Sequence, residues 1–306
     1  MSNGGERQAM KSSSIKGNQW SLYLMVLPVL ILWLLFVLYP ALTNFFYCFF
    51  DYNGIGSPLV FKGLDNFVRA FTRDWYTFSA GFINSIKYSV VVSFVQNLFA
   101  IGLAVLLTKN LKMTNVYRAI LFFPAVVGTM VIAMAWALLL DTRGVFNACL
   151  HLLNLPSTTP WLGHPVWSFW IISFVIIWMY TGYSMVIYIA GLQQIDQQYY
   201  EAATVDGANN WQKFKKVTLP LLMPSITINM LLSLAGTFRI FDLPFLLGGG
   251  DFHAISRPTV TMSLNIYYEF QKMQYGYACA QQVILFFMVL LVAIIQTRIT
   301  IKREVA

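Results

Sequence analysis

Six long apolar stretches alternate with shorter polar segments along this chain of 306 residues. A helix needs about 20 consecutive apolar residues to cross the hydrocarbon core of a bilayer, and the stretches reach that length. Lipid offers the backbone no hydrogen-bond partner, and the period-two alternation of a membrane barrel is absent, so each stretch is predicted to be a helix. The sequence therefore predicts an all-α integral membrane protein with six transmembrane helices. The predicted spans are 21–47, 86–108, 117–140, 167–191, 219–247 and 278–299.

Composition and charge support this prediction and orient the spans. Charged residues make up only 10% of the chain, whereas soluble proteins carry about 25%. Twelve Lys and Arg residues lie in the segments on one side, and six lie in the loops on the other. Because cytoplasmic loops carry the excess of positive charge, both termini are predicted to be cytoplasmic. We expect tails at 1–20 and 301–306, a transmembrane domain at 21–300 and a cytoplasmic loop at 192–218.

Several kinds of chemistry find no support in the sequence. The three cysteines and three histidines form no metal-ligand spacing, and the basic residues are too dispersed for a nucleic-acid partner. None of the 19 glycines is followed by lysine, as a phosphate-binding Walker loop requires. No serine nucleophile elbow or paired intramembrane carboxylates occur. We therefore expect a non-catalytic chain that binds no cofactor or metal ion itself.

The cytoplasmic segment 192–218 has the signals of two short helices. Asp196 is predicted to cap a helix over 197–205, because its side chain can accept hydrogen bonds from the free N–H groups of the first turn. Gly207 suits the left-handed residue that ends a helix. Asn209 or Asn210 can then cap a second helix.

The same segment carries large apolar side chains next to water. The second helix is predicted to run through Val217, and Leu219-Pro220 is predicted to start the next helix, since proline is tolerated in a first turn. An exposed apolar patch favours a protein-binding surface, and the alternative is an amphipathic loop on the lipid face. The side chains concerned are Tyr199, Tyr200, Trp211 and Phe214.

The fifth span carries a polar stripe at helical spacing, formed by Ser225, Asn229, Ser233, Gly236 and Thr237. In hydrocarbon such a stripe faces protein or water, so it is either a helix-packing surface or the wall of a path for a hydroxyl-rich solute. The two interpretations are equal for Ser225 and Gly236, and the path is favoured for Ser233 and Thr237.

Two further features accompany this stripe. In the fourth span Tyr180, Tyr183 and Ser184 share a face, and tyrosine rings can stack on sugars, although core tyrosines explain the pattern almost as well. Arg239 and Asp242 are expected to pair or to face water, either as an outer gate or as an ordinary salt bridge. A second stripe is predicted to be a packing seam between helices. Its residues are Ser85, Ser89, Ser93, Gln96 and Asn97.

One motif resembles a known family. Glu201-Ala202-Ala203 is followed after three residues by Gly207, after nine more by Val217 and after one more by Leu219-Pro220. This pattern resembles the E-A-A cytoplasmic loop of the membrane subunits of bacterial ABC importers. The resemblance implies a type I permease-like fold, with a family core at about 84–299. It also implies docking to an ATPase subunit through this loop. The implied docking residues are Glu201, Ala202, Ala203, Asp206, Gly207, Leu219 and Pro220.

Other segments resemble the carbohydrate branch of these importers, in the maltose and glycerol-3-phosphate group. They include Leu27-Pro28, Tyr39-Pro40, Phe61 to Phe67 and Phe123-Pro124. The resemblance implies a multi-pass protein of the bacterial cytoplasmic membrane that moves a sugar or related polyol by alternating access. The implied partners are a second, homologous permease in a heterodimer, two nucleotide-binding subunits that hold ATP and magnesium, and an extracytoplasmic solute-binding protein.

The alternative is a stand-alone secondary transporter or channel for a small polar solute. Such a protein needs intramembrane acidic or histidine side chains for ion coupling. The second, third, fourth and sixth predicted spans contain no internal acid, and the fifth offers only Asp242 near its end. From the polar stripe of the fifth span and the tyrosines of the fourth, the substrate path is expected to involve Tyr180, Tyr183, Asn229, Ser233 and Thr237.

Overall fold

A computed structural model describes residues 19–108, 112–155, 159–248 and 259–304 of the chain. Within these ranges the protein is mainly helical, as predicted. The chain divides into two compact units, residues 1–46 and 47–306, which are described separately.

The first unit contains one apolar helix with a π-helical turn. Helix α1 spans Gln19–Trp33, the π-helical turn spans Leu34–Leu38, and α2 begins at Tyr39 and ends at Tyr47. The backbone N–H of Tyr39 donates to the carbonyl of Leu34, five residues earlier. Pro40 follows directly, and because proline has no N–H to donate, the wider turn fits its place in the helix.

The second unit begins with a two-stranded antiparallel sheet, β1 (Phe50–Asp51) and β2 (Val60–Phe61), in which Phe50 pairs with Phe61. Helices follow to the end of the chain. They are α3 (Asp65–Phe71), α4 (Trp75–Leu107), α5 (Thr114–Val126), α6 (Thr129–Leu139), α7 (Val145–Leu152), α8 (Trp167–Gln193), α9 (Gln197–Val205), α10 (Asn210–Lys213), a π-helical turn (Phe214–Thr218), α11 (Leu219–Leu221), α12 (Met223–Phe238), α13 (Asp242–Leu247), α14 (Met262–Gln271) and α15 (Tyr275–Glu304).

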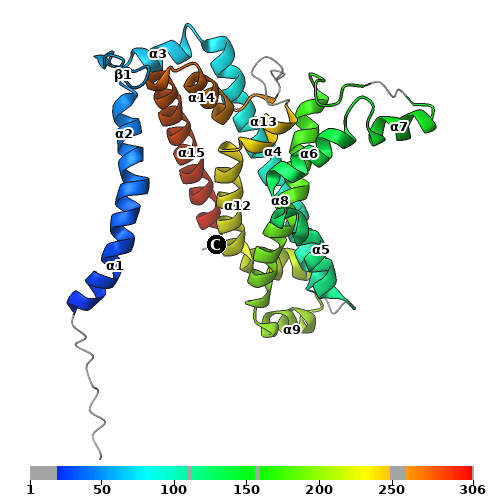
Figure 1. Cartoon of the computed structure of the whole chain (residues 1–306). Helices are drawn as coiled ribbons and strands as arrows, with labels where there is room; N and C mark the ends of the chain where they lie inside the picture. Colours follow the sequence, from blue (N-terminus) through cyan, green and yellow to red (C-terminus); the bar gives the residue numbers. More distant parts are fainter. Residues whose placement is uncertain (1–18, 109–111, 156–158, 249–258, 305–306) are drawn as a thin grey trace, which may run out of the picture. The chain divides into compact units, whose positions relative to one another are not determined.

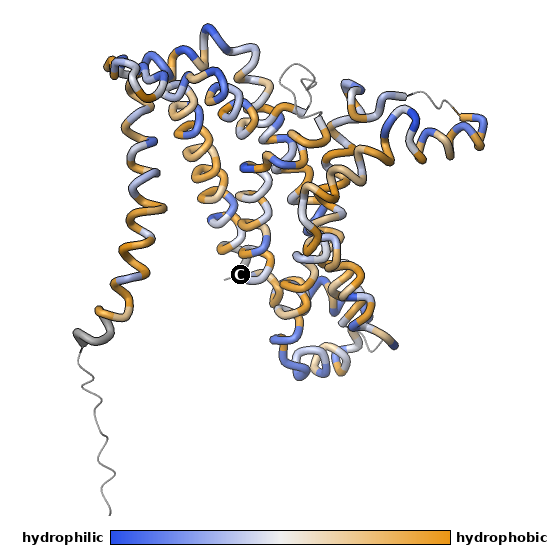
Figure 2. Tube along the Cα trace, viewed as in Figure 1, coloured by the Kyte–Doolittle hydropathy of each residue, from blue (hydrophilic) through white to orange (hydrophobic). Residues whose placement is uncertain are grey.

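Four helical segments are long and apolar enough to cross a membrane within the ranges described. They are Leu24–Tyr47, Trp75–Leu107, Trp167–Gln193 and Tyr275–Ile301. Two bent helix pairs bring the number to six if each pair counts as one span. The long helices are largely hydrophobic in Figure 2, whereas the region around α9 is hydrophilic.

The third predicted span, 117–140, is wrong as a single straight helix. Helices α5 and α6 meet at 92°, and Val127 and Gly128 between them have extended backbone conformations. Pro124 lies in the last turn of α5 and cannot donate a helical hydrogen bond. Hydropathy continues through the bend unchanged, so the apolar pattern did not reveal it.

The fifth predicted span, 219–247, is also broken. Helix α12 covers only Met223–Phe238, and α13 begins at Asp242. The second span starts at Trp75 rather than 86, and the sixth is part of a helix that continues to Glu304. The expected tail at 301–306 therefore begins with helical residues.

The core of this unit centres on α4, which packs against α8 and α12, while α5 packs mainly against α8. Gly182 of α8 lies against α5 so closely that an added Cβ atom would stand 1.9 Å from the carbonyl oxygen of Leu121. Only glycine fits this crossing. In Figure 1, α9 lies at one end of the unit, and α3 and α14 lie at the other.

Candidate functional site

The segment with the E-A-A pattern folds into two capped helices. The Asp196 Oδ1 atom accepts a hydrogen bond of 3.0 Å from the backbone N–H of Gln198, as predicted for the start of α9. Gly207 has φ of +73°, which confirms the predicted left-handed residue. Asn209 caps α10, and Gln212 completes a reciprocal capping box with it.

The prediction that Leu219-Pro220 starts a new helix is wrong. The helix from Asn210 continues through a π-helical turn and ends at Leu221, and the bend of 67° to α12 falls at Leu222. Pro220 is tolerated inside because the preceding turn already departs from the regular hydrogen-bond pattern. Pro224, in the first turn of α12, instead marks the start of the next helix.

Side-chain contacts hold the two helices of the loop together. The hydroxyl groups of Tyr200 and Thr218 lie 3.1 Å apart, and the Lys213 Nζ atom donates to the Thr204 hydroxyl at 2.7 Å. Trp211 is 68% exposed and Val205 87% exposed. Exposed apolar side chains on a capped helix pair are expected of a surface that binds another protein. The same exposed side chains are equally expected of an amphipathic loop on the lipid surface.

The predicted docking residues lie on the surface of this loop. Ala203 and Leu219 are partly buried, and the others are exposed: Glu201, Ala202, Asp206, Gly207 and Pro220. The loop thus presents one acidic side chain from α9 and one from its C-cap beside small residues that permit close approach.

A cavity of about 600 Å³ lies between α4, α8 and α12. All five predicted path residues and both predicted gate residues line it. They are Tyr180, Tyr183, Asn229, Ser233 and Thr237, with Arg239 and Asp242. Tyr180 and Tyr183 lie on α8 and are exposed, whereas Asn229 and Thr237 lie on α12 and are buried.

Asn97 of α4 is a hydrogen-bond hub behind this wall. Its Nδ2 group donates to the Ser233 hydroxyl at 2.9 Å, and its Oδ1 atom accepts from the Asn229 side chain at 2.7 Å. The hydroxyl group of Tyr188 also donates to Oδ1. One buried amide therefore links α4, α8 and α12 and fixes two side chains of the cavity wall.

The predicted packing seam on α4 is confirmed. Ser85, Ser89, Ser93, Gln96 and Asn97 are all buried. Ser93 and Thr237 hydroxyl groups lie 3.2 Å apart, and the Gln96 amide donates to the Ser184 hydroxyl at 2.7 Å. Polar side chains of α4 thus take part in its packing against α8 and α12, beside buried residues such as Tyr88 and Val92.

The structure separates the two undecided residues of α12. Ser225 belongs to packing, because a Cβ atom on Gly191 would lie 2.2 Å from its hydroxyl oxygen. Gly236 has open space around it and lines the cavity. Ser225 therefore lets α12 approach α8 closely, whereas Gly236 leaves cavity volume open farther along α12.

Arg239 and Asp242 do not form an ion pair with each other in the described part of the chain. Both are exposed and line the cavity, where the backbone passes from α12 to α13. The expected pairing between the two residues is therefore not seen, and the expectation that they face water stays a prediction.

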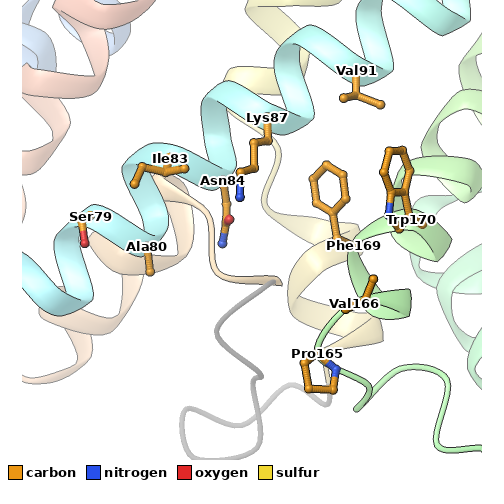
Figure 3. A pocket seen from close by; sticks show the side chains of 10 residues that line it. All are labelled: Ser79, Ala80, Ile83, Asn84, Lys87, Val91, Pro165, Val166, Phe169 and Trp170. Atoms are coloured by element: carbon orange, nitrogen blue, oxygen red, sulfur yellow. The ribbon is translucent and has the colours of Figure 1, made fainter.

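A second cavity, of about 610 Å³, was not anticipated (Figure 3). Lys87 points from α4 into this space, beside Asn84 and across from Phe169 at the start of α8. The only sequence signal was a charged residue, Lys87, at the start of a predicted span. In the ranges described, no group of three or more His, Cys, Asp and Glu side chains could hold a metal ion.

Comparison with known proteins places the chain in a family. Residues 96–301 match the family described as binding-protein-dependent transport system inner membrane component. The probable starch degradation products transport system permease protein AmyD of Thermoanaerobacterium thermosulfurigenes is 32% identical, covering 97% of this chain and 99% of that protein. The trehalose/maltose transport system permease protein MalF of Thermococcus litoralis is 31% identical, covering 90% and 92%.

Solved structures share the fold. A chain in the crystal structure of a bacterial alginate ABC transporter, in complex with alginate pentasaccharide-bound periplasmic protein, gives a TM-score of 0.81 at 23% identity. The match covers 94% of this chain and 96% of that chain. The chain therefore belongs to the binding-protein-dependent transport system inner membrane components, the multi-pass, non-catalytic permease subunits of ABC transporters.

Proposed function

We propose that this permease imports a sugar, an oligosaccharide or a related polyol through the cavity between α4, α8 and α12. The convergence of seven residues on one cavity carries the proposal. Hydroxyl and amide groups of Asn229, Ser233 and Thr237 supply donors and acceptors for sugar hydroxyls, and the exposed rings of Tyr180 and Tyr183 offer stacking surfaces. The names of relatives that transport starch degradation products and trehalose or maltose favour the same class of solute.

The connection between loop and cavity suggests how transport is driven. A helix from Asn210 to Leu221 leads through the bend at Leu222 into α12, which carries five residues of the cavity lining. Leu222 at the bend is fully buried and packs with Tyr188 and Leu192 of α8. A displacement of the loop is thereby transmitted to α12 as a rigid-body change, consistent with alternating access.

We infer that the loop docks on a nucleotide-binding subunit, through Glu201, Ala202, Ala203, Asp206, Gly207, Leu219 and Pro220. The complete transporter contains two such subunits, which hold ATP and magnesium. It also contains a second homologous permease and an extracytoplasmic binding protein that delivers the solute near Arg239 and Asp242, the proposed outer gate.

Uptake by the reconstituted complex tests the function. Proteoliposomes with all subunits should accumulate a sugar that the binding protein retains, and only with ATP inside. Ser233→Trp should abolish uptake because it fills the cavity, while basal ATPase activity and assembly persist. Ile228→Trp is the control, since Ile228 is exposed on α12 and does not line the cavity. Uptake by this chain alone under an ion gradient would instead establish the secondary transporter.

Labelling tests the proposed orientation, with both termini cytoplasmic. Ile55 and Asn210 are exposed and lie in regions assigned to opposite sides. After replacement of the exposed Cys149, an impermeant thiol reagent added to cells should modify Ile55→Cys and spare Asn210→Cys. The reverse pattern would place the E-A-A loop outside and exclude its contact with an ATPase.

A further inference from the structure

The cavity of about 610 Å³ between α4 and the start of α8 is electropositive. Among the described residues that line it, Lys87 is the only charged one, and its side chain points into the space (Figure 3). Lys87 forms no ion pair within the part of the chain that the structure describes. The remaining polar lining consists of Ser79 and Asn84, which are neutral. The cavity therefore offers a positive charge that no lining carboxylate compensates.

Lys87 stands at the boundary between the loops and the apolar part of α4. Asn84, on the preceding turn, donates to the carbonyl oxygen of Val260 at 3.0 Å and so ties α4 to the segment before α14. In Figure 1, α14 lies at the end of the unit opposite α9. The rest of α4, residues 88–107, carries no charged side chain. At 1.5 Å per residue it is about 30 Å long, which matches the hydrocarbon core of a bilayer. Lys87 is therefore at the level of the lipid headgroups.

The face of α4 that carries Lys87 looks away from the proposed solute path. Phe94 and Leu98 follow on this face at helical spacing, and each is 62% exposed. Gln96, which lines the path cavity, lies on the opposite side of the helix. Across from Lys87, Trp170 of α8 lines the cavity and is 51% exposed, as is typical of tryptophan at a membrane surface. The charged cavity thus continues into exposed apolar side chains.

Charge and apolar surface together select one class of ligand. A phosphate group suits the Lys87 ammonium, and acyl chains suit the exposed apolar side chains below it. A zwitterionic lipid would bring its own cationic group into a cavity whose lining has no carboxylate to receive it. A soluble anion would leave the apolar surface uncovered. An anionic phospholipid satisfies both parts of the surface.

We propose that this cavity binds the headgroup of an anionic phospholipid, such as phosphatidylglycerol, with the phosphate on Lys87. The acyl chains lie along the exposed side chains of Phe94 and Leu98. The lipid belongs to the outer leaflet in the proposed orientation of the chain. It contacts α4 and α8 from the membrane side, whereas the solute contacts the same two helices from the path side.

Native mass spectrometry of the purified complete transporter can count the lipids that it retains. The complex in detergent is titrated with dioleoylphosphatidylglycerol and, separately, with dioleoylphosphatidylcholine. In Lys87→Gln, the affinity for one phosphatidylglycerol per complex should fall roughly fivefold, because one cation at the headgroup is lost. Binding of phosphatidylcholine should not change. Lys87→Arg keeps the charge and should keep the phosphatidylglycerol.

Two control variants separate this site from the general attraction of anionic lipid to a basic protein. Lys62→Gln removes an exposed lysine that does not line the cavity and should have no effect on this lipid. Ile83→Glu places a carboxylate in the lining one turn before Lys87, where it can pair with the ammonium and should weaken lipid binding. Ile86→Glu makes the same charge change outside the lining and should not.

The comparison between variants decides the proposal. Melting temperatures establish that each variant is folded, and Ile83→Glu provides the test if Lys87→Gln does not fold. Equal retention of phosphatidylglycerol in Lys87→Gln and Lys62→Gln, or in the two glutamate variants, overturns the site. Displacement of the lipid by millimolar inorganic phosphate would make the cavity a site for a soluble anion instead. The measurement requires no transport, so a failure of sugar import would leave its result unchanged.

Discussion

The two faces of α12 use the same polar residue types for different purposes. Toward α4, Asn229 and Thr237 meet buried side chains that satisfy them, and Asn97 joins three helices through one amide. Toward the cavity, Gly236 borders open volume, and Ser233 lines the wall while it also accepts a hydrogen bond from Asn97. A polar residue in a membrane helix therefore does not by itself mark a solute path. The internally satisfied face holds the helices, and this rigid arrangement positions the groups on the open face.

The largest effect is expected from breaking the satisfied face at its centre. Asn97→Leu removes every bond of the hub and leaves the Tyr188 hydroxyl and the Asn229 amide without this buried partner. The cost in unfolding free energy should be about 3 kcal/mol or more, because each orphaned group is costly. Thermal melting of the purified complex measures it. Ser89→Ala, which loses a long bond of 3.4 Å, should cost far less. An equal loss of unfolding free energy in the two variants would show that Asn97 is no more important for stability than Ser89.

A change in the docking loop should leave both faces of α12 intact. Gly207→Val places a β-branched residue at φ of +73°, at a local cost of about 1–2 kcal/mol. Solute-stimulated ATPase activity should be lost, while solute binding by the assembled permeases persists. Glu201→Lys should have the same effect by reversing an exposed charge on α9. Normal stimulated activity in both variants would contradict ATPase docking at this loop.

A smaller effect is expected at Thr237, which belongs to both faces. Its hydroxyl lies 3.2 Å from the Ser93 hydroxyl, and the residue also lines the cavity. Thr237→Val keeps the shape and removes the hydroxyl, so stability should fall by about 1 kcal/mol and solute affinity should fall modestly. Ser93→Ala provides the control, since it removes the same seam contact from the α4 side and should lower stability alone. An affinity loss of the same size in both variants would mean that the seam, not the hydroxyl, controls binding.

The sequence predicted local features of the fold better than it predicted how the helices bend and cross. The Asp196 cap, the left-handed Gly207 and the buried seam of α4 followed from residue type and spacing. The bend at Val127 did not, because hydropathy continues through it, and the end of α12 at Phe238 did not, although the charged residues Arg239 and Asp242 follow it. The grouping of the path residues around one cavity depends on how three helices cross. The Asn97 hub likewise depends on that crossing, which no local pattern encodes.

The cavity lining outside α12 is tested at Tyr183, which is exposed on α8. Tyr183→Phe keeps the ring for stacking and removes one hydroxyl, so stability should be unchanged. Solute affinity should fall roughly three- to tenfold through loss of one hydrogen bond. Tyr117→Phe is the control, because Tyr117 is similarly exposed on α5 and lies outside the cavity lining. Isothermal titration of the complex with the solute measures affinity, and melting measures stability. A lowered melting temperature with unchanged affinity would assign Tyr183 to helix packing. The solute would then be contacted by residues of α12 rather than by Tyr183 of α8.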